Sequence, residues 1–150
     1  MTDARDPLEF DGKVAIVTGG GGGIGYAIAR AFALQGARVA IAGRTERTLT
    51  RSAAAIEAEC GRPVLPIVAD VAEAADCERM IAAAVDCFGA VDILVNNAAL
   101  FAVRSLIDAD AAETARTFAV NAIGPLTAAR AFARWAIVLV KLSSAAFDAE

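Results

Sequence analysis

Histidine is absent from this 150-residue sequence. Its absence excludes the Ser-His-Asp and Cys-His arrangements of hydrolases, in which a histidine is the general base. The three cysteines, Cys60, Cys77 and Cys87, form no C-x-x-C pair. We therefore expect neither a metal site nor a disulfide framework, and the cytoplasm is the natural compartment. Proton transfer would fall to Tyr, Lys, Ser or carboxylate side chains.

Basic charge and long apolar runs are scarce as well. The net charge is -4 at pH 7, which gives no support for binding to nucleic acid or to an anionic membrane. No apolar run exceeds six residues, too few to span a bilayer. Residues 1–12 are polar and acidic and lack the apolar core of a signal peptide, so we expect a flexible lead-in. The remaining residues, 13–150, fit one domain.

Glycine, by contrast, is concentrated in one stretch. Five consecutive glycines, Gly19–Gly23, separate the apolar run Val14–Val17 from a segment with apolar residues at helical spacing. A buried strand, a glycine turn and a helix N-terminus together form an anion site, because glycine lets a phosphate approach the free N–H groups of the helix. The stretch therefore predicts a dinucleotide-binding turn. A flexible glycine linker is the alternative, although linkers seldom join a strand to an amphipathic helix.

Two spacings of dinucleotide-binding motifs fit this glycine run. One is Gly20-x-Gly22-x-x-Gly25, and the other is Thr18-Gly19-x-x-x-Gly23-x-Gly25. A run of glycines satisfies several patterns at once, so spacing alone does not choose between them.

Strand-like and helix-like segments alternate along the whole chain. Such alternation predicts an α/β fold with right-handed βαβ units, a Rossmann-type doubly wound parallel sheet of about five strands in the order 3-2-1-4-5. Ligands bind such sheets at the carboxyl ends of the strands. The expected strands are Val14–Val17, Arg38–Ala42, Val64–Ala69, Asp92–Asn96 and Ala136–Val140, and the later helices are Glu46–Glu59, Ala72–Phe88 and Asp110 to about Arg134.

Arg44 follows the second expected strand, where an NAD site usually has an acidic residue for the ribose 2′-hydroxyl. The nearest acid is Glu46. An arginine suits the 2′-phosphate of NADP through charge-assisted hydrogen bonds, so NADP(H) is favoured over NAD(H). A solvated arginine that opens a helix is the alternative.

Two Asp-x-x-Glu patterns precede expected helices, at Asp70 and at Asp110. Each is a capping box, in which the aspartate accepts a hydrogen bond from the first helical turn. Asp70 also lies at the carboxyl edge of the sheet, where its carboxylate has capacity left to accept a bond from an adenine amino group. For Asp110 we expect only the structural role.

Asparagines occur at two further positions where a ligand could bind. Asn96-Asn97-Ala98-Ala99 leaves the fourth strand; the asparagines suit a turn, and the small alanines let a flat ring approach. Asn121 lies four residues before Pro125, which has no N–H to pair with the Asn121 carbonyl. We expect a kink there that leaves this carbonyl free for water or a ligand; a plain proline kink is the alternative.

Together these residues resemble the short-chain dehydrogenase/reductase family over roughly Lys13 to Ser144. The resemblance selects the glycine motif that begins at Thr18 and implies hydride transfer between a nicotinamide and a small carbonyl or alcohol substrate. It implies catalytic roles for Asn121, whose main-chain carbonyl holds a relay water, and for Ser144, which polarises the substrate. The cofactor-binding residues that it implies are Thr18, Gly19, Gly23, Ile24, Gly25, Asp70, Val71, Asn96 and Ala98. Arg44 joins this set because of its position after the second strand.

The sequence departs from the family pattern in its proton-transfer residues. In the family a Tyr-x-x-x-Lys motif follows the serine, but the one tyrosine here is Tyr26 and the two lysines are Lys13 and Lys141. We therefore expect the amino-terminal portion of such an enzyme, truncated after the fifth strand. A full-length protein of this kind would be a homo-oligomer. An uncovered fifth strand would pair with another chain or aggregate. The alternative functions are a non-catalytic nucleotide- or partner-binding module and a decayed fragment.

Overall fold

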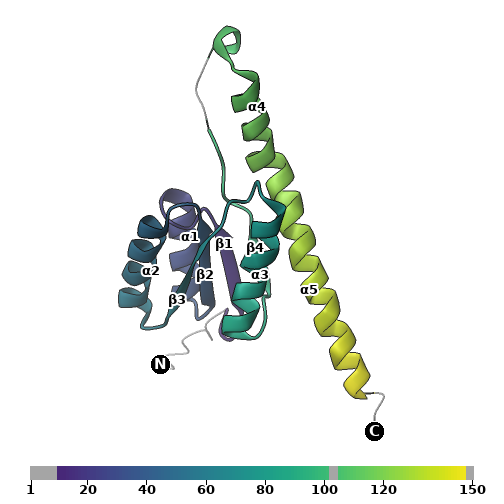
Figure 1. The fold of residues 1–150 in the computed structure, drawn as a ribbon. Helices are drawn as coiled ribbons and strands as arrows, with labels where there is room; N and C mark the ends of the chain where they lie inside the picture. The colour runs from purple at the N-terminus through teal and green to yellow at the C-terminus, as the bar shows by residue number, and fades with distance from the viewer. Residues whose placement is uncertain (1–9, 102–104, 148–150) are drawn as a thin grey trace, which may run out of the picture.

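The fold comes from a computed structural model that describes residues 10–101 and 105–147. Parallel strands alternate with helices along the chain (Figure 1). The expected lead-in over residues 1–12 lies largely outside the described residues. The strands are β1 (Val14–Thr18), β2 (Arg38–Gly43), β3 (Val64–Val68) and β4 (Ile93–Val95). The helices are α1 (Gly23–Leu34), α2 (Glu46–Cys60), α3 (Ala74–Phe88), the short 3-10 helix η1 (Leu106–Asp108), α4 (Ala111–Phe118), the π-helical segment η2 (Ala119–Ile123) and α5 (Gly124–Phe147).

The sheet has the strand order β3-β2-β1-β4, with every neighbouring pair parallel. The predicted order is thus confirmed for the first four strands. Val17 of β1 lies opposite Ile41 of β2 on one side and opposite Val95 of β4 on the other. The chain reverses its direction of winding between β3 and β4, so β1 is central. Its carboxyl end lies at the topological switch point, where ligands bind in this class of sheet.

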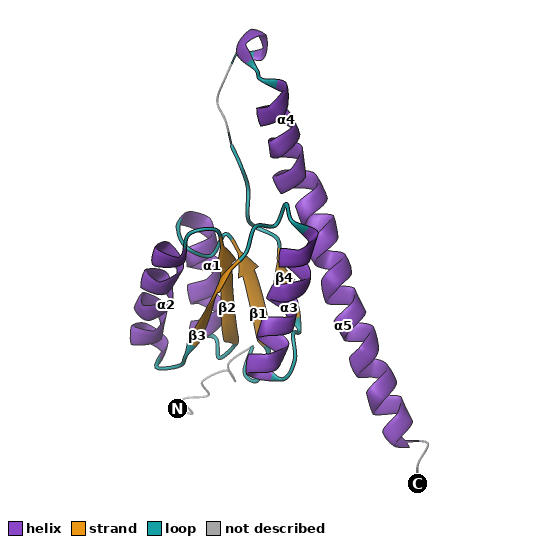
Figure 2. Cartoon of the chain, viewed as in Figure 1, coloured by secondary structure: helices purple, strands orange, loops and turns teal. Residues whose placement is uncertain are grey.

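Alternating side chains of β1 build two separate apolar cores. Val14 and Ile16 pack with residues of α3 and α5 on one face of the sheet. Val17 points to the other face and packs with α1 and α2. Figure 2 shows the resulting three layers, with helices on both sides of the strands. Because both faces are covered, the strands are nearly continuous runs of apolar residues.

The expected fifth strand, Ala136–Val140, is wrong. These residues continue α5, a single helix that runs from Gly124 to Phe147 past α3 (Figure 1). No glycine or proline follows Pro125 in the sequence, so nothing ends the helix. Each further helical residue adds an internal hydrogen bond, whereas a strand would need pairing along β4. Among the described helices, none combines the length and the hydrophobicity that a membrane span requires.

The irregularity expected before Pro125 is present, but as a change of helix type. Over η2 the backbone is π-helical, and the N–H of Gly124 bonds to the carbonyl oxygen of Ala119, five residues earlier. A π-helical turn is a known response to a residue that cannot complete the i→i−4 ladder. Asn121 lies inside this turn, and its side chain reaches Leu100 in the loop after β4.

Candidate nucleotide-binding site

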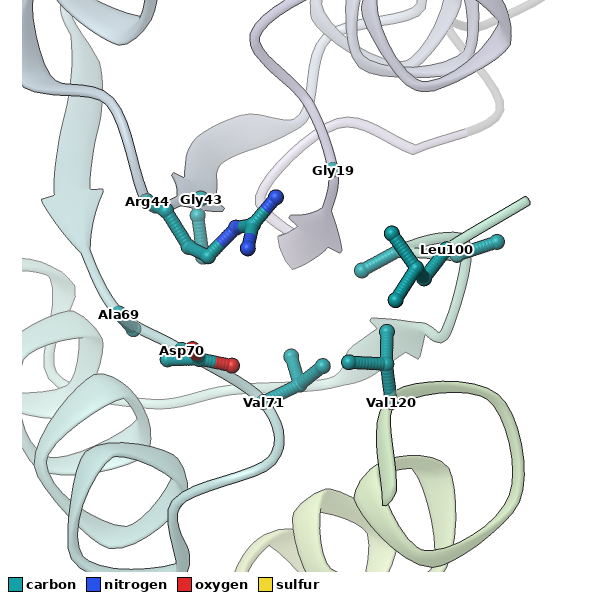
Figure 3. Close-up of a pocket in the computed structure, with 11 residues that line it drawn as sticks. Gly19, Gly43, Arg44, Ala69, Asp70, Val71, Leu100 and Val120 are labelled. Carbon is teal, nitrogen blue, oxygen red and sulfur yellow. The ribbon is translucent and has the colours of Figure 1, made fainter. Parts of the chain in front are cut away.

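A cleft of about 170 Å³ opens at the carboxyl ends of the strands. It is lined from four different segments that the sheet brings together: the glycine turn, the end of β2, the loop after β3 and the loop after β4. Val120 of η2 closes one side (Figure 3). The lining residues are Gly19, Ala42, Gly43, Arg44, Ala69, Asp70, Val71, Ala98, Ala99, Leu100 and Val120.

The glycine turn follows the spacing that begins at Thr18. Gly19 and Gly23 both have positive φ angles, 69° and 53°, which favour glycine. A Cβ at Gly19 would also lie 2.8 Å from the Asn97 Nδ2 atom, and one at Gly25 would collide with the Gly19 carbonyl oxygen. Gly22, by contrast, has extended backbone and open space around it. Three of the motif glycines are therefore required by geometry. In the rival spacing Gly20 also lacks room for a Cβ, which would lie 2.7 Å from Ile41, whereas Gly22 does not, so the two spacings differ at Gly22.

Thr18 holds the loop after β4 against the end of β1. The residue is 1% exposed, and its hydroxyl accepts hydrogen bonds from the N–H groups of Asn97 and Ala98, both at 3.0 Å. The same hydroxyl donates to the Val95 carbonyl oxygen at 3.2 Å, and the Asn97 Nδ2 donates to the Thr18 carbonyl at 2.9 Å. Thr18 thus lies behind the cleft and positions Ala98, which lines it.

Two asparagine side chains join this loop to the helix behind it. Asn96 Nδ2 donates to the carbonyl oxygen of Pro125 at 3.3 Å. Asn121 Oδ1 accepts the N–H of Leu100 at 2.7 Å, and its Nδ2 donates to the Leu100 carbonyl at 2.8 Å. Asn121 was singled out for its main-chain carbonyl, but its side chain is what holds Leu100 at the cleft.

Arg44 and Asp70 face each other across the mouth of the cleft (Figure 3). Arg44 directly follows β2 and is exposed, so its guanidinium is accessible to a ligand. A second hollow of about 200 Å³, lined by Arg44, Thr45 and Thr48, continues from the cleft and shares Gly19 and Gly43 with it. Thr45 is the N-cap of α2, yet its side chain makes no capping hydrogen bond.

The capping role expected for Asp70 is wrong. Helix α3 begins at Ala74 with Glu73 as its N-cap, and no side chain caps it. Asp70 Oδ1 instead accepts the N–H of Ala72 at 3.0 Å, and Oδ2 is paired with the guanidinium of Arg116 on α4. The Asp70 N–H donates to Asp76 Oδ2 at 2.8 Å. A local turn and a distant arginine therefore occupy the carboxylate that the pattern assigned to the helix end.

These contacts keep Asp70 ionised. Partial burial raises the pKa of Asp70, but the hydrogen bonds from Ala72 and Arg116 and the charges of Arg116 and Arg44 outweigh burial. The pKa of Asp70 consequently lies below its ordinary value. At neutral pH the site presents one carboxylate beside the accessible cation of Arg44.

The remaining candidates are divided between the cleft and other places. Val71 and Ala98 line the cleft. Ile24 does not line it, because this residue is 75% exposed at the start of α1. Ser144 was expected at the end of a fifth strand; because that segment is helical, the residue lies near the carboxyl end of α5. The structure does not bring Ser144 to the carboxyl edge of the sheet.

Sequence reasoning missed three residues that shape the site. Leu100 and Val120 supply apolar wall, and Arg116 supports Asp70. Val120 could have been found from its place one residue before Asn121. Arg116 has no local signal, because its partner lies 46 residues away in the sequence.

Comparison with known proteins identifies relatives over most of the chain. The profile of the short chain dehydrogenase family matches residues 13–144. A sorbitol dehydrogenase of Cereibacter sphaeroides is 40% identical over 127 residues, which are 85% of this chain and 48% of that protein. The chain thus spans about half the length of the curated relatives that it matches.

Solved structures share the fold. A short-chain type dehydrogenase/reductase from Mycobacterium marinum superposes with a TM-score of 0.82 at 35% identity, covering 87% of this chain and 52% of that one. L-Sorbose reductase from Gluconobacter frateurii, solved with NADPH and L-sorbose, has a TM-score of 0.78 at 30% identity; 83% of this chain and 48% of that chain are covered.

Proposed function

The chain belongs to the short-chain dehydrogenase/reductase family, and on this premise we propose that it provides the nucleotide-binding half of an NADP(H)-dependent oxidoreductase. Its substrate is a small molecule with a carbonyl or an alcohol group. The nicotinamide ring supplies or accepts the hydride in such a reaction. The residues of this chain bind and orient the nucleotide.

The observation that carries the proposal is the position of Arg44. Its guanidinium is exposed at the end of β2 and lines both the cleft and the adjoining hollow of about 200 Å³ with Thr45 and Thr48. A cationic fork beside two hydroxyl groups suits a phosphate ester, because guanidinium binds phosphate oxygens in a bidentate manner. This supports the 2′-phosphate of NADP(H) over the free hydroxyl of NAD(H). The relative from Gluconobacter frateurii was solved with NADPH.

The rest of the lining suits the other parts of a dinucleotide. The glycine turn leaves no room for a Cβ at Gly19 and Gly25 and begins a helix with no side-chain cap, which suits a pyrophosphate. Val71, Leu100 and Val120 form an apolar wall for an adenine ring, and Asp70 has acceptor capacity left for its amino group. The small Ala98 lets the nucleotide pass close to the backbone.

A second candidate is a nucleotide-binding module without turnover of its own. One observation favours it: the cleft lining described here contains neither tyrosine nor lysine. Tyr26 lines a different hollow, beside the outer side of the glycine turn, and Lys13 pairs with Asp92 at 3.7 Å just before β1. Binding and turnover therefore need separate measurements.

The deciding experiment is calorimetric titration of the 150-residue chain with NADPH and, separately, with NADH. Saturable binding with tighter affinity for NADPH supports the proposal, and equal affinities would refute the assignment to NADP(H). Oxidation of NADPH in the presence of a panel of ketones and sugars then separates the two candidates. Turnover would eliminate the module without catalysis, whereas binding without turnover would favour it.

A further inference from the structure

Arg116 reaches from α4 to the rim of the cleft without lining it. Its Nη2 donates to Asp70 Oδ2, and the two side chains are 34% and 23% exposed, so the pair is partly shielded from solvent. Asp70 lines the cleft, whereas Arg116 is not among its lining residues. The arginine thus contacts a carboxylate of the cleft without forming part of the cleft wall.

Two hydrogen bonds fix the carboxylate plane of Asp70. Ala72 N–H holds Oδ1 at 3.0 Å and Arg116 holds Oδ2, so each oxygen keeps one acceptor position. Without Arg116 a single backbone hydrogen bond would remain, and the side chain would be free to turn about it. A fixed acceptor discriminates a ligand amino group better than a mobile one, because its orientation costs no entropy on binding.

The same ion pair holds the segment that forms the apolar wall. Helix α4 buries none of its own side chains and continues directly into η2, so the Arg116–Asp70 pair is a direct contact between α4 and the edge of the sheet. Val120, four residues after Arg116, is buried and lines the cleft together with Asp70. Residues four apart lie on nearly the same side of a helix, so Arg116 and Val120 approach the cleft together.

We propose that Arg116 is a positioning residue for the adenine end of the nucleotide: through Asp70 it orients the acceptor for the adenine amino group, and through α4 it holds Val120 against the ring. The assignment rests on the proposed binding of NADP(H). Arg116 itself touches neither the nucleotide nor the substrate.

The test measures the affinity for NADP⁺ and for 2′,5′-ADP, which has the adenine and the 2′-phosphate but no nicotinamide. Arg116→Gln is expected to weaken both about tenfold, a typical coupling for residues in one network. Arg116→Lys, which keeps the charge, should recover part of the loss. Arg134→Gln is the matched control. It removes an arginine on α5 that pairs with Glu78 of α3 at 3.3 Å, and neither residue lines the cleft. This variant should change neither affinity.

A pH profile separates orientation from general loosening. The charged groups around Asp70 are Arg44 after β2, Arg116 on α4, and Asp76 with its partner Arg79 on α3; the Cys77 thiol also lies nearby. Loss of Arg116 raises the pKa of Asp70, so the pH below which 2′,5′-ADP affinity declines should move upward in Arg116→Gln but not in Arg134→Gln. The titration of the phosphate groups of 2′,5′-ADP cancels when the affinities of two variants are divided at each pH.

Each outcome has a distinct meaning. Wild-type affinity and an unshifted pH profile in Arg116→Gln would overturn the positioning role while leaving NADP(H) binding intact. Absence of saturable binding in the wild-type chain would overturn the proposed function and this assignment with it. Should Arg116→Gln fail to fold, Arg116→Lys decides, since the proposal requires weaker 2′,5′-ADP binding than wild type in that folded variant.

Discussion

The side chain of Asn121 pairs with the backbone of Leu100 as a neighbouring strand would. Leu100 N–H donates to Asn121 Oδ1 at 2.7 Å, and Asn121 Nδ2 donates to the Leu100 carbonyl at 2.8 Å, across 21 residues of sequence. Leu100 lines the cleft and Asn121 lies in the π-helical turn. The amide therefore connects the loop after β4 to the π-helical turn of η2.

Replacing Asn121 by alanine should loosen this loop. Both bonds are accessible to solvent, so we expect Asn121→Ala to lower the free energy of unfolding by about 1 kcal/mol and to weaken nucleotide binding through the displaced Leu100. Urea denaturation and calorimetry provide the two measurements. Thr127→Ala is the control, because it removes one bond within the helix, from the Thr127 hydroxyl to the carbonyl oxygen of Ile123 four residues earlier, and none to the loop after β4. Equal stability and affinity of Asn121→Ala and wild type would contradict the clamp.

The buried hydroxyl of Thr18 allows a nearly isosteric test. Thr18→Val leaves the N–H groups of Asn97 and Ala98 without their acceptor, so the free energy of unfolding should fall by about 2–4 kcal/mol. Thr18→Ser keeps the hydroxyl and loses one methyl group, which costs about 1 kcal/mol. The prediction fails if urea denaturation finds the valine variant as stable as the serine variant.

An added methyl group should destabilise the protein at Gly25 but have little effect at Gly22. Gly25→Ala brings a Cβ against the Gly19 carbonyl oxygen, so we expect a loss of about 1–3 kcal/mol and no measurable binding of NADPH. Gly22 has open space and extended backbone, and Gly22→Ala should stay within about 1 kcal/mol of wild type. Thermal denaturation and NADPH titration of the pair test this, and similar behaviour of both variants would argue against the assigned motif.

Reversing the charge at Arg44 should change the cofactor preference. Arg44→Asp removes the cation expected at the 2′-phosphate and offers a carboxylate to a ribose hydroxyl. The ratio of the dissociation constants for NADH and NADPH should fall at least about tenfold, as expected for one charge-assisted bond. Arg47→Asp, an exposed arginine on α2 outside both hollows, makes the same charge change as a control. An unchanged ratio in Arg44→Asp refutes the assignment.

Asp70 should make stability depend on acid pH. Its folded-state pKa is depressed, so its contribution is present above the ordinary aspartate pKa of about 3.9 and is lost as pH falls through the folded-state pKa. Wild type should therefore exceed Asp70→Asn in free energy of unfolding at pH 7, and the two should converge as pH falls below about 4. Urea denaturation between pH 7 and 3 measures the difference in free energy of unfolding between the two proteins. The contributions of the other carboxylates are common to both and cancel in this difference. A difference independent of pH would show that Asp70 is not paired as described.

Two identical sequence patterns had different outcomes in the structure. Asp110 is the N-cap of α4, and its Oδ2 accepts the N–H of Glu113 at 3.2 Å, as the capping box predicts. Asp70 has the same Asp-x-x-Glu pattern but caps nothing, because Ala72 and Arg116 bind its carboxylate and α3 begins at Ala74. A local pattern predicts local hydrogen bonds only where no distant group competes for the same oxygens.

The mistaken fifth strand has a related cause. A run of six apolar residues fits a buried strand or a buried helix equally well, and periodicity cannot distinguish them. The sequence contains no glycine or proline between Pro125 and the apolar run, and this lack of a helix stop was the signal that favoured a helix. Continuous helix satisfies each added backbone group within itself, whereas a strand depends on a neighbour at β4.

By itself the sequence determined the class of fold, the strand order around β1 and the glycine turn, because apolar periodicity and the steric limits of a Cβ act over a few residues. Only the tertiary structure decided that Thr18 and Asn121 hold the loop after β4 and that Arg116 supports Asp70. These contacts join positions 21 to 80 residues apart, such as Asn121 with Leu100 and Thr18 with Ala98. Such pairs have no spacing rule in the chain, since the sheet and its crossovers bring them together.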